Sequence, residues 1–329
     1  MRGGNAAEAR ALWYVGPGKA EIRAGTLAPL TGGQVRVRAL CGALSRGTES
    51  LVCSGRVPPS EYRRMRAPFM VGDFPFPVKY GYATVGRVEA GPESLTGRTV
   101  FSLHPHQTLF DIPAEAAIPL PDDVPPARAV LAANMETALN ALWDAQPGPA
   151  DRIAIVGAGV VGSLVAWLCA RLPGAEVTLV DIDSSRAALA GALEVKFAAP
   201  SDAPRDCDLV VHASGQASGL ATAIDLAGDE ATILELSWYG EGDVPVPFGG
   251  AFHSRRLKLV SSQVGKIAPS HRARWDHRRR LCAALSLLRS PRLDALLAPA
   301  IPFERLPGEI SRILSPGSGI LCQRIVYPD

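Results

Sequence analysis

The sequence predicts an α/β protein in which a β-rich first part precedes a doubly wound parallel sheet. Two observations carry this prediction. Short apolar or alternating runs bounded by Gly and Pro fill residues 1–125, and from Arg152 onward apolar strands alternate with helical segments. The 329-residue chain is 47% hydrophobic and 20% charged, which is enough apolar material for a large buried core.

Composition also narrows the class of protein. The 34 basic and 32 acidic residues leave a formal net charge of +2, so the basic surplus typical of nucleic-acid binding is missing. No apolar run is long enough to predict a membrane span, and Met1–Ala11 lacks the apolar region of a secretory signal. The 6 cysteines are scattered without a C-x-x-C motif. We therefore expect a cytoplasmic protein with reduced cysteines and a small-molecule partner.

The first part is expected to be all-β. Closely spaced short strands separated by Gly and Pro turns are typical of a β-barrel. The longer connection Tyr62–Phe76 indicates a surface loop or a short helix. The predicted strands are Ala11–Val15, Gln34–Ala39, Ala83–Glu89 and Arg98–Ser102.

The second part begins with a predicted helix over Ala127–Trp143, which Pro147-Gly148-Pro149 ends. Strands that then alternate with helices imply βαβ units and a parallel sheet. The predicted strands are Ile153–Val156, Glu176–Val180, Asp208–His212 and Ala231–Ser237, and the helices are Val161–Leu172, Ser184–Leu193 and Leu220–Ala227. A helix over Trp275–Leu288 and a strand over Cys322–Tyr327 complete the chain.

A glycine-rich string joins the first strand of this part to its helix. It is Gly157-Ala158-Gly159-Val160-Val161-Gly162, which matches G-x-G-x-x-G. The first glycine permits the tight turn, the second lets the backbone approach a pyrophosphate, and the third allows close helix–sheet packing. The helix N-terminus offers free N–H groups to the phosphates. Strand, loop and helix together predict a Rossmann dinucleotide-binding unit.

Asp181 ends the second strand of this unit. A carboxylate there accepts hydrogen bonds from the adenosine ribose hydroxyls and repels a 2′-phosphate, so we expect NAD(H) rather than NADP(H). We include the neighbouring Ile182 in the expected site. Arg186 could add a hydrogen bond near the ribose, or it could weaken the bias and leave NADP possible. The alternative is a glycine-rich turn without a nucleotide, in which Asp181 caps a helix.

The order of these motifs resembles the medium-chain dehydrogenase/reductase family, the alcohol-dehydrogenase-like enzymes. The resemblance covers essentially the whole chain. It implies a GroES-like β-barrel catalytic domain over 1–130, a Rossmann domain over 131–265 and a segment over 266–329 that completes the sheet and returns to the catalytic domain. It also implies a homodimer joined through the edge of the nucleotide sheet, and an active site in the cleft between the domains. The matching segments are Gly42–Glu49 (GALSRGTE), Gly81–Gly86 (GYATVG), Gly97–Phe101 (GRTVF), His212–Gly215 (HASG) and Ser237–Gly240 (SWYG).

By the same resemblance, two strand ends are expected to line the nicotinamide pocket, and they contribute Ser214, Gly215, Ser237 and Trp238. Ser45–Gly55 (SRGTESLVCSG) is locally similar to the hydroxyethyl bacteriochlorophyllide dehydrogenases of this family.

The zinc ligands of the family are replaced in this chain. Where the zinc enzymes carry a Cys in the first active-site turn and a His in a GHE segment, this sequence offers Ser45 (or Arg46) and Tyr82. The third ligand region reads Ala133–Glu136, and the four-cysteine lobe of the structural zinc is missing. Serine and tyrosine are poor zinc ligands, so we expect a zinc-free member with no metal site.

Without zinc, a side chain must protonate the developing alkoxide. Tyr82 is the first candidate, and Lys79, close by in the sequence, is expected to lower its pKa. The alternative is that Tyr80 and Tyr82 are strand residues of one face whose hydroxyls reach solvent. His104 and His106, expected to face one side, are the second candidates, as proton shuttles or as metal ligands completed by Glu49 or Glu136.

Two further residues belong to the expected pocket. Thr48 sits in the first turn, where the family's Thr or Ser relays a proton to the nicotinamide ribose, although it could equally cap the turn. Glu136 lies near the third ligand position, or is an ordinary carboxylate of a first helical turn.

Basic residues gather in His271–Arg280. We interpret them as a solvated helix face rather than as a contact to an anionic ligand. Arg255 and Arg256, which precede a strand, are better placed to approach the cofactor.

Together these features predict a zinc-independent NAD(P)(H)-dependent oxidoreductase that interconverts an alcohol and a carbonyl, with NAD(H) preferred. One alternative is an enoyl or quinone reductase that acts on an activated C=C bond. The other is an inactive NAD(H)-binding sensor or scaffold.

Overall fold

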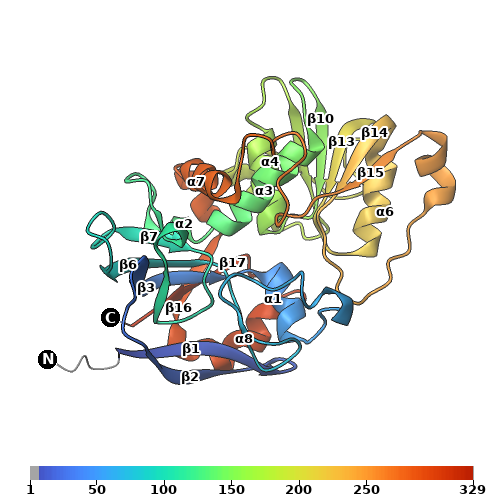
Figure 1. The fold of residues 1–329 in the computed structure, drawn as a ribbon. Helices are drawn as coiled ribbons and strands as arrows, with labels where there is room; N and C mark the ends of the chain where they lie inside the picture. The colour runs from blue at the N-terminus through green and yellow to red at the C-terminus, as the bar shows by residue number, and fades with distance from the viewer. Residues whose placement is uncertain (1–6, 329) are drawn as a thin grey trace, which may run out of the picture. The chain divides into compact units, whose positions relative to one another are not determined.

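The computed structural model describes residues 7–328, which divide into two compact units (Figure 1). Within the described residues, unit 1 contains 7–133, Leu285–Arg289 and 297–328. Unit 2 contains Asn134–Ala284 and Ser290–Leu296.

Unit 2 is built on a 6-stranded sheet with the order β12-β11-β10-β13-β14-β15, and every neighbouring pair is parallel. The strands are β10 (Arg152–Val156), β11 (Glu176–Val180), β12 (Lys196–Ala198), β13 (Cys207–His212), β14 (Ala227–Glu235) and β15 (Lys258–Ser261). Its helices are α3 (Ala132–Ala145), α4 (Val160–Cys169), α5 (Arg186–Ala192), α6 (Ala217–Leu226) and α7 (His277–Leu287), of which α3 begins and α7 ends in unit 1. The strand order reverses between β10 and β13, which confirms the predicted doubly wound sheet.

The sheet forms because its central strands are continuously apolar. Ile153, Ala154 and Ile155 of β10 are fully buried, as expected for a parallel strand covered on both faces. Leu220, Ala223 and Ile224 of α6 belong to the same hydrophobic core as β10 and β13.

The register brings the carboxyl ends of five strands into one row. Val180, Val156, His212, Glu235 and Ser261 are successive cross-strand partners from β11 to β15. The loops that follow these residues therefore start side by side at one edge of the sheet, where ligands of open α/β sheets bind.

Unit 1 is β-rich, as predicted. A 4-stranded sheet has the order β2-β1-β5-β4, and a 7-stranded sheet has the order β16-β17-β3-β6-β7-β9 with β8 paired to β3. The first contains β1 (Ala7–Gly16), β2 (Lys19–Leu27), β4 (Val71–Gly72) and β5 (Val78–Lys79). The second contains β3 (Gln34–Leu44), β6 (Thr84–Ala90), β7 (Thr99–Ser102), β8 (Leu109–Pro113), β9 (Ile118–Pro119), β16 (Leu297–Pro302) and β17 (Cys322–Val326), and the helices are α1 (Arg46–Cys53), α2 (Pro126–Ala129) and α8 (Leu306–Leu314).

Some elements differ from the sequence-based expectation. The strand β2 was not predicted because none of its residues is buried, so it lacks the apolar alternation of a half-buried strand. The single helix expected over Ala127–Trp143 is two helices, α2 and α3. Inside the predicted loop Tyr62–Phe76 lies the short strand β4.

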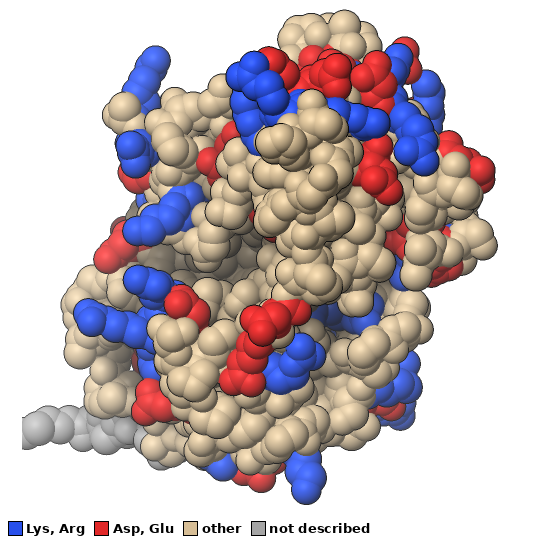
Figure 2. All heavy atoms as spheres, turned by 90° about the vertical axis from the view of Figure 1, so that its right-hand side faces the viewer, with Lys and Arg blue, Asp and Glu red and all other residues tan. Residues whose placement is uncertain are grey.

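Two surface properties complete the fold. None of the helices in the described part of the chain is long and apolar enough to cross a membrane. On the face drawn in Figure 2, basic and acidic side chains are interspersed rather than gathered into a patch of one sign.

Candidate functional site

The glycine-rich loop lies between β10 and α4, and each glycine has its own steric reason. Gly157 has a φ of 111°, and a Cβ there would lie 2.6 Å from the Ser214 nitrogen. A Cβ on Gly162 would lie 2.0 Å from the Gly157 oxygen, so only glycine lets α4 pack this closely. At Gly159 a Cβ would meet nothing within 4 Å, which leaves open space against the backbone.

That open space meets the first turn of α4. Gly159 is the N-cap residue of α4 and has no side chain that could cap the helix. The N–H groups of Val160, Val161 and Gly162 in the first turn therefore receive no side-chain cap. An uncapped helix N-terminus next to an open glycine favours an anion such as a pyrophosphate. The local structure therefore fits the phosphates of a dinucleotide.

The Asp181 carboxylate is held against this loop. Its Oδ2 accepts the Ala158 N–H at 2.7 Å, and its Oδ1 accepts the Asp183 N–H at 2.9 Å. The next residue, Ile182, is 89% exposed and offers an apolar surface beside the carboxylate. Arg186 forms an ion pair with Asp183 at 3.4 Å. The residues expected to bind the adenosine half are thus gathered at the ends of β10 and β11.

The residues expected at the nicotinamide half follow β13 and β14. The Gly215 N–H donates to Ser237 Oγ at 3.0 Å, which ties the two loops together. Trp238 is half-buried in the second loop. Sequence reasoning missed two members of this group. His212 opens the matching HASG segment but was not counted among the site residues, and Glu235 ends a buried strand and belongs to no motif.

In unit 1, the candidate proton donor Tyr82 lies in the loop before β6, outside any strand. Its side chain is hydrogen-bonded with the side chains of Ser45, which precedes α1, and Thr48 in the first turn of α1. Burial raises the pKa of Tyr82 to about 12, although both hydroxyls oppose the rise. The structure therefore brings together three of the predicted residues as one hydroxyl cluster.

Lys79 does not have its predicted role. Its Nζ donates to Gln107 Oε1 at 2.7 Å, and burial lowers its pKa. Because the pKa of Tyr82 is raised and Lys79 is not among its causes, the expectation that this ammonium lowers the phenol pKa is wrong.

His104 is a packed core residue rather than a proton shuttle. Its ring stacks on Phe110 with centroids 3.8 Å apart, and on Phe69 at 5.6 Å. Its Nδ1 lies 2.8 Å from the Pro105 oxygen. Burial lowers the pKa of His104 to about 3, so the imidazole stays neutral at the pH where a shuttle must titrate.

His106 has different partners from His104, so the expectation that the two act on one side is wrong. The His106 Nε2 lies 2.9 Å from Glu49 Oε2, to which the Tyr14 hydroxyl also donates at 2.7 Å. The second oxygen of Glu49 accepts the Ser45 N–H at 2.8 Å. All three side chains are buried, and burial together with Glu49 raises the pKa of Tyr14. Tyr14 was missed because β1 carries no motif.

A metal at these histidines finds no third ligand in residues 7–328. No group of three His, Cys, Asp or Glu side chains is placed to hold an ion there. Glu136, one of the two expected supplements, belongs to unit 2 and is engaged elsewhere.

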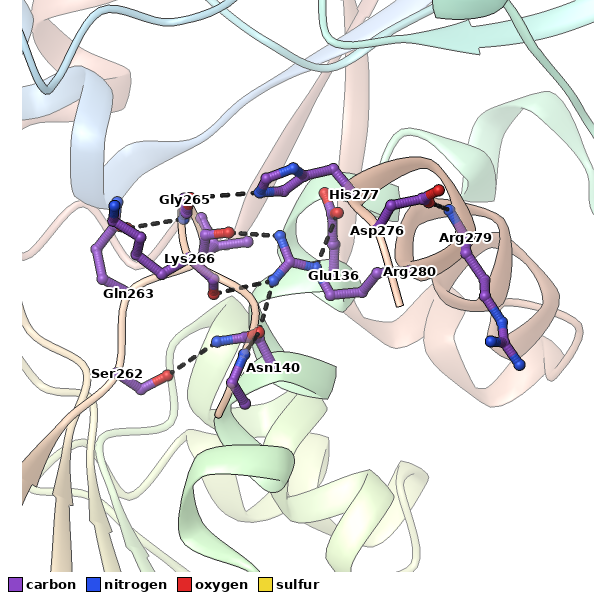
Figure 3. A network of polar contacts seen from close by, with 12 residues as sticks. Glu136, Asn140, Ser262, Gln263, Gly265, Lys266, Asp276, His277, Arg279 and Arg280 are labelled. Atoms are coloured by element: carbon purple, nitrogen blue, oxygen red, sulfur yellow. Dashed lines mark hydrogen bonds and ion pairs between the residues drawn. The ribbon is translucent and has the colours of Figure 1, made fainter. Parts of the chain in front are cut away.

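Glu136 forms a buried ion pair with Arg280, as Figure 3 shows. Its Oε1 lies 3.0 Å from Arg280 Nε, and the two side chains are 6% and 1% exposed. Arg280 also donates to Asn140 Oδ1 at 2.5 Å and to the carbonyls of Lys266 and Val264. The pair therefore fixes the loop after β15 against α3 and α7.

The structure changes our interpretation of the basic cluster His271–Arg280 and of the pair Arg255 and Arg256. The solvated helix face holds for Arg279, but Arg280 is buried. Arg255 donates to the Ala227 carbonyl at 2.7 Å, and Arg256 pairs with Glu230 at 3.0 Å. Both partners lie in the first half of β14, so these arginines sit at the amino ends of the strands, opposite the predicted cofactor edge.

Comparisons with known proteins support the fold. No protein-family model and no curated protein sequence matches the chain, whereas many solved structures do. L-idonate 5-dehydrogenase from Escherichia coli K-12 has a TM-score of 0.80 at 14% identity and covers 98% of this chain and 99% of its own. The 2R,3R-butanediol dehydrogenase from Bacillus subtilis has a TM-score of 0.76 at 15% identity over 98% of this chain and 100% of its own.

A third structure was solved with a cofactor. It is a short chain alcohol dehydrogenase from E. coli CFT073 complexed with NADH, with a TM-score of 0.77 at 15% identity over 98% of this chain and 100% of its own. At such identities the likeness shows the fold. The chain therefore has the predicted α/β fold, a Rossmann doubly wound parallel sheet together with a GroES-like β domain.

Proposed function

We propose that the protein is a metal-independent, NAD(P)(H)-dependent oxidoreductase of the medium-chain dehydrogenase/reductase family. It interconverts an alcohol and a carbonyl by hydride transfer and prefers NAD(H). The observation that carries the proposal is the hydroxyl cluster of Tyr82, Ser45 and Thr48. By the resemblance, Ser45 and Tyr82 stand at sequence positions where zinc enzymes of this family hold their metal, and Thr48 stands at the proton-relaying position. All three are groups that move protons and bind zinc poorly.

The protonation state of Tyr82 favours one direction of the proposed reaction, carbonyl reduction. When a hydride reaches a carbonyl carbon, the oxygen becomes an alkoxide that needs a proton. With its pKa raised to about 12, Tyr82 keeps its proton at neutral pH and can donate it, while Ser45 and Thr48 hold the phenol oxygen in place. The same pKa leaves very little phenolate at neutral pH to accept the proton of an alcohol, so Tyr82 serves reduction better than oxidation there.

The cofactor assignment rests on the edge formed by Gly157–Gly162 and Asp181. When bound there, a nicotinamide dinucleotide supplies the hydride. The chain's own residues provide N–H groups for the phosphates and a carboxylate for the adenosine ribose, and this carboxylate disfavours a 2′-phosphate.

The test of the proton donor is Tyr82→Phe, which keeps the ring and removes the hydroxyl. We expect kcat for carbonyl reduction to fall by roughly 10²–10⁴-fold while the Kd of NADH stays unchanged. Tyr62→Phe is the matched control, since the Tyr62 ring packs on Phe74 and is separated from Tyr82 by two intervening rings, Phe74 and Tyr80. Unchanged turnover in Tyr82→Phe would exclude it as the donor.

The substrate panel should contain ketones, aldehydes and activated enones. Reduction of the enones alone would favour the enoyl or quinone reductase alternative. Tight NADH binding without turnover on any compound would favour the sensor or scaffold. About one zinc per purified chain would overturn the metal-independent proposal.

The cofactor preference is tested with Asp181→Ala. We expect the ratio of the Kd values for NADPH and NADH to fall by about tenfold or more, because the variant loses both the ribose acceptor and the repulsive charge. Asp225→Ala is the control, because it removes an exposed carboxylate of α6 that lies outside the expected cofactor site.

We also propose a cytoplasmic homodimer with a small-molecule substrate. The cytoplasmic location is supported by the 6 cysteines, all of which are free. The dimer is supported by β15, an edge strand whose Leu259 and Val260 are each 37% exposed.

A further inference from the structure

A hydrogen-bonded row of three side chains crosses the carboxyl ends of β13 and β14. Ser214 Oγ lies 2.6 Å from His212 Nε2, and His212 Nδ1 lies 2.7 Å from Glu235 Oε2. The His212 ring is fully buried, whereas Ser214 and Glu235 are half-buried. We name Ser214, His212 and Glu235 the relay.

The direction of the His212–Glu235 hydrogen bond follows from Glu235. Burial alone would raise its pKa, but hydrogen bonds from His212 and Ser237 hold the pKa of Glu235 below its usual value, so it is a carboxylate. A carboxylate only accepts, so His212 Nδ1 donates the proton of this bond, while the second ring nitrogen, Nε2, lies within hydrogen-bonding distance of Ser214 Oγ. Glu235 also accepts the Tyr239 hydroxyl at 3.1 Å and the Ser237 N–H at 2.7 Å.

The relay joins two loops, 213–216 and 236–239. Ser214 belongs to the first loop, and Glu235 holds Ser237 and Tyr239 of the second, so the single buried ring of His212 determines their spacing. The Gly215 N–H donates to Ser237 Oγ and closes the connection from the other side.

The first loop also lies directly on the glycine-rich loop. The Ala213 N–H donates to the Val156 oxygen at 2.8 Å, and the backbone of Ser214 occupies the place where a side chain on Gly157 would be. On the other side, a Cβ on Gly219 of α6 would lie 2.2 Å from Ser214 Oγ and 2.7 Å from His212 Nε2. The relay is therefore enclosed between the glycine-rich loop and α6.

A dinucleotide bound as proposed would have its adenosine ribose at Asp181, after β11, and its pyrophosphate at α4, after β10. Its remaining half would then extend over the ends of β13 and β14, across the switch point. We propose that His212 is a positioning residue that holds the two loops in the geometry that receives the nicotinamide half of the cofactor. This inference rests on the proposed function, because it takes the cofactor as given.

A serine, an imidazole and a carboxylate in a row also occur around nucleophilic serines. Here the two backbone N–H groups that follow Ser214 are used inside the loops, because Gly215 donates to Ser237 and Gln216 donates to Ser214 itself. Backbone donors for an oxyanion beside Ser214 are therefore occupied, which favours the positioning role.

The test compares two ligands, NADH and ADP-ribose, the second of which lacks the nicotinamide. In His212→Gln and Ser214→Ala we expect the Kd of NADH, measured by calorimetric titration, to rise about tenfold, as when a buried hydrogen-bonding partner is lost. The Kd of ADP-ribose should change less than about twofold, since Asp181 and α4 remain in place. Ser218→Ala, an exposed serine of α6, is the control and should change neither.

Gly219→Ala tests the same inference in a second way. Its added methyl displaces Ser214 and His212 without removing any group of the relay, so it should reproduce the selective loss even if His212→Gln folds poorly. Equal weakening of both ligands, or unchanged NADH binding in every variant, would overturn this inference alone. A wild-type protein that binds neither NADH nor NADPH would overturn the proposed function, and with it this inference.

Discussion

The buried ion pair of Glu136 and Arg280 permits a quantitative prediction about stability. Arg280→Met keeps an unbranched side chain of similar length but removes the guanidinium, which is 1% exposed and donates to Glu136, Asn140 and two carbonyls. The variant leaves the Glu136 carboxylate buried without its cation. Breaking a buried pair in this way costs about 3–5 kcal/mol of the free energy of unfolding.

Urea denaturation followed by tryptophan fluorescence measures this loss. Of the 5 tryptophans, only Trp13 lies in unit 1, so the signal reports chiefly on unit 2. Arg279→Met is the matched control, because this exposed arginine stacks on Trp275 with its guanidinium carbon 4.0 Å from the ring centroid. We expect it to cost no more than about 1 kcal/mol. An Arg280→Met protein within about 1 kcal/mol of the wild type would refute the reasoning.

Three further predictions follow from the same structure. The rate of alcohol oxidation should rise with pH up to about 11, because oxidation needs the phenolate of Tyr82. The rate of carbonyl reduction should be flat between about pH 6 and 9, because the raised pKa of Tyr82 keeps the phenol protonated in this range. A plateau of the oxidation rate at neutral pH would contradict this prediction. Burial lowers the pKa of His104 from 6.5 to about 3, so the unfolded chain binds its proton more readily and the free energy of unfolding should fall as the pH drops through this window. In urea titrations, His104→Phe should show a smaller fall than the wild type. Val260→Lys should convert the proposed dimer to a monomer in light scattering, and a dimer of unchanged affinity would place the interface elsewhere.

Much of the fold could be predicted because its signals are local. A continuous apolar run such as Ile153–Val156 can be recognised without knowing its neighbours, and a glycine-rich turn marks where its helix begins. The strand β2 gave no such signal, since its stability comes from pairing with β1 rather than from burial of its own side chains.

The sequence was enough to predict where site residues lie when they belong to a matching segment. It was not enough to predict the partners and protonation of a side chain, because these depend on how distant segments pack. Ser45 and Thr48 belong to one predicted turn, and the resemblance matches Ser45 and Tyr82 to two ligand positions of one metal site, so the contact of Tyr82 with Ser45 and Thr48 could be expected from the sequence. The different fates of His104 and His106 depend on aromatic neighbours and on Glu49, which are distant in sequence. In the sequence, Arg280 cannot be distinguished from the exposed arginines beside it. It is buried because of the way α7 is oriented in the fold.

The shared hydrogen bonds of Glu49 affect which amino-acid substitutions this protein should tolerate. One carboxylate accepts from Tyr14 of β1 and from the backbone of Ser45, and its Oε2 lies within hydrogen-bonding distance of His106, so three separate segments share a single acceptor. In a saturation mutational scan scored by growth, substitutions at Tyr14 and His106 should therefore resemble those at Glu49 in severity. The half-buried neighbours Trp13 and Val15 on β1 should accept more residues, and this contrast would show that the three segments depend on one another.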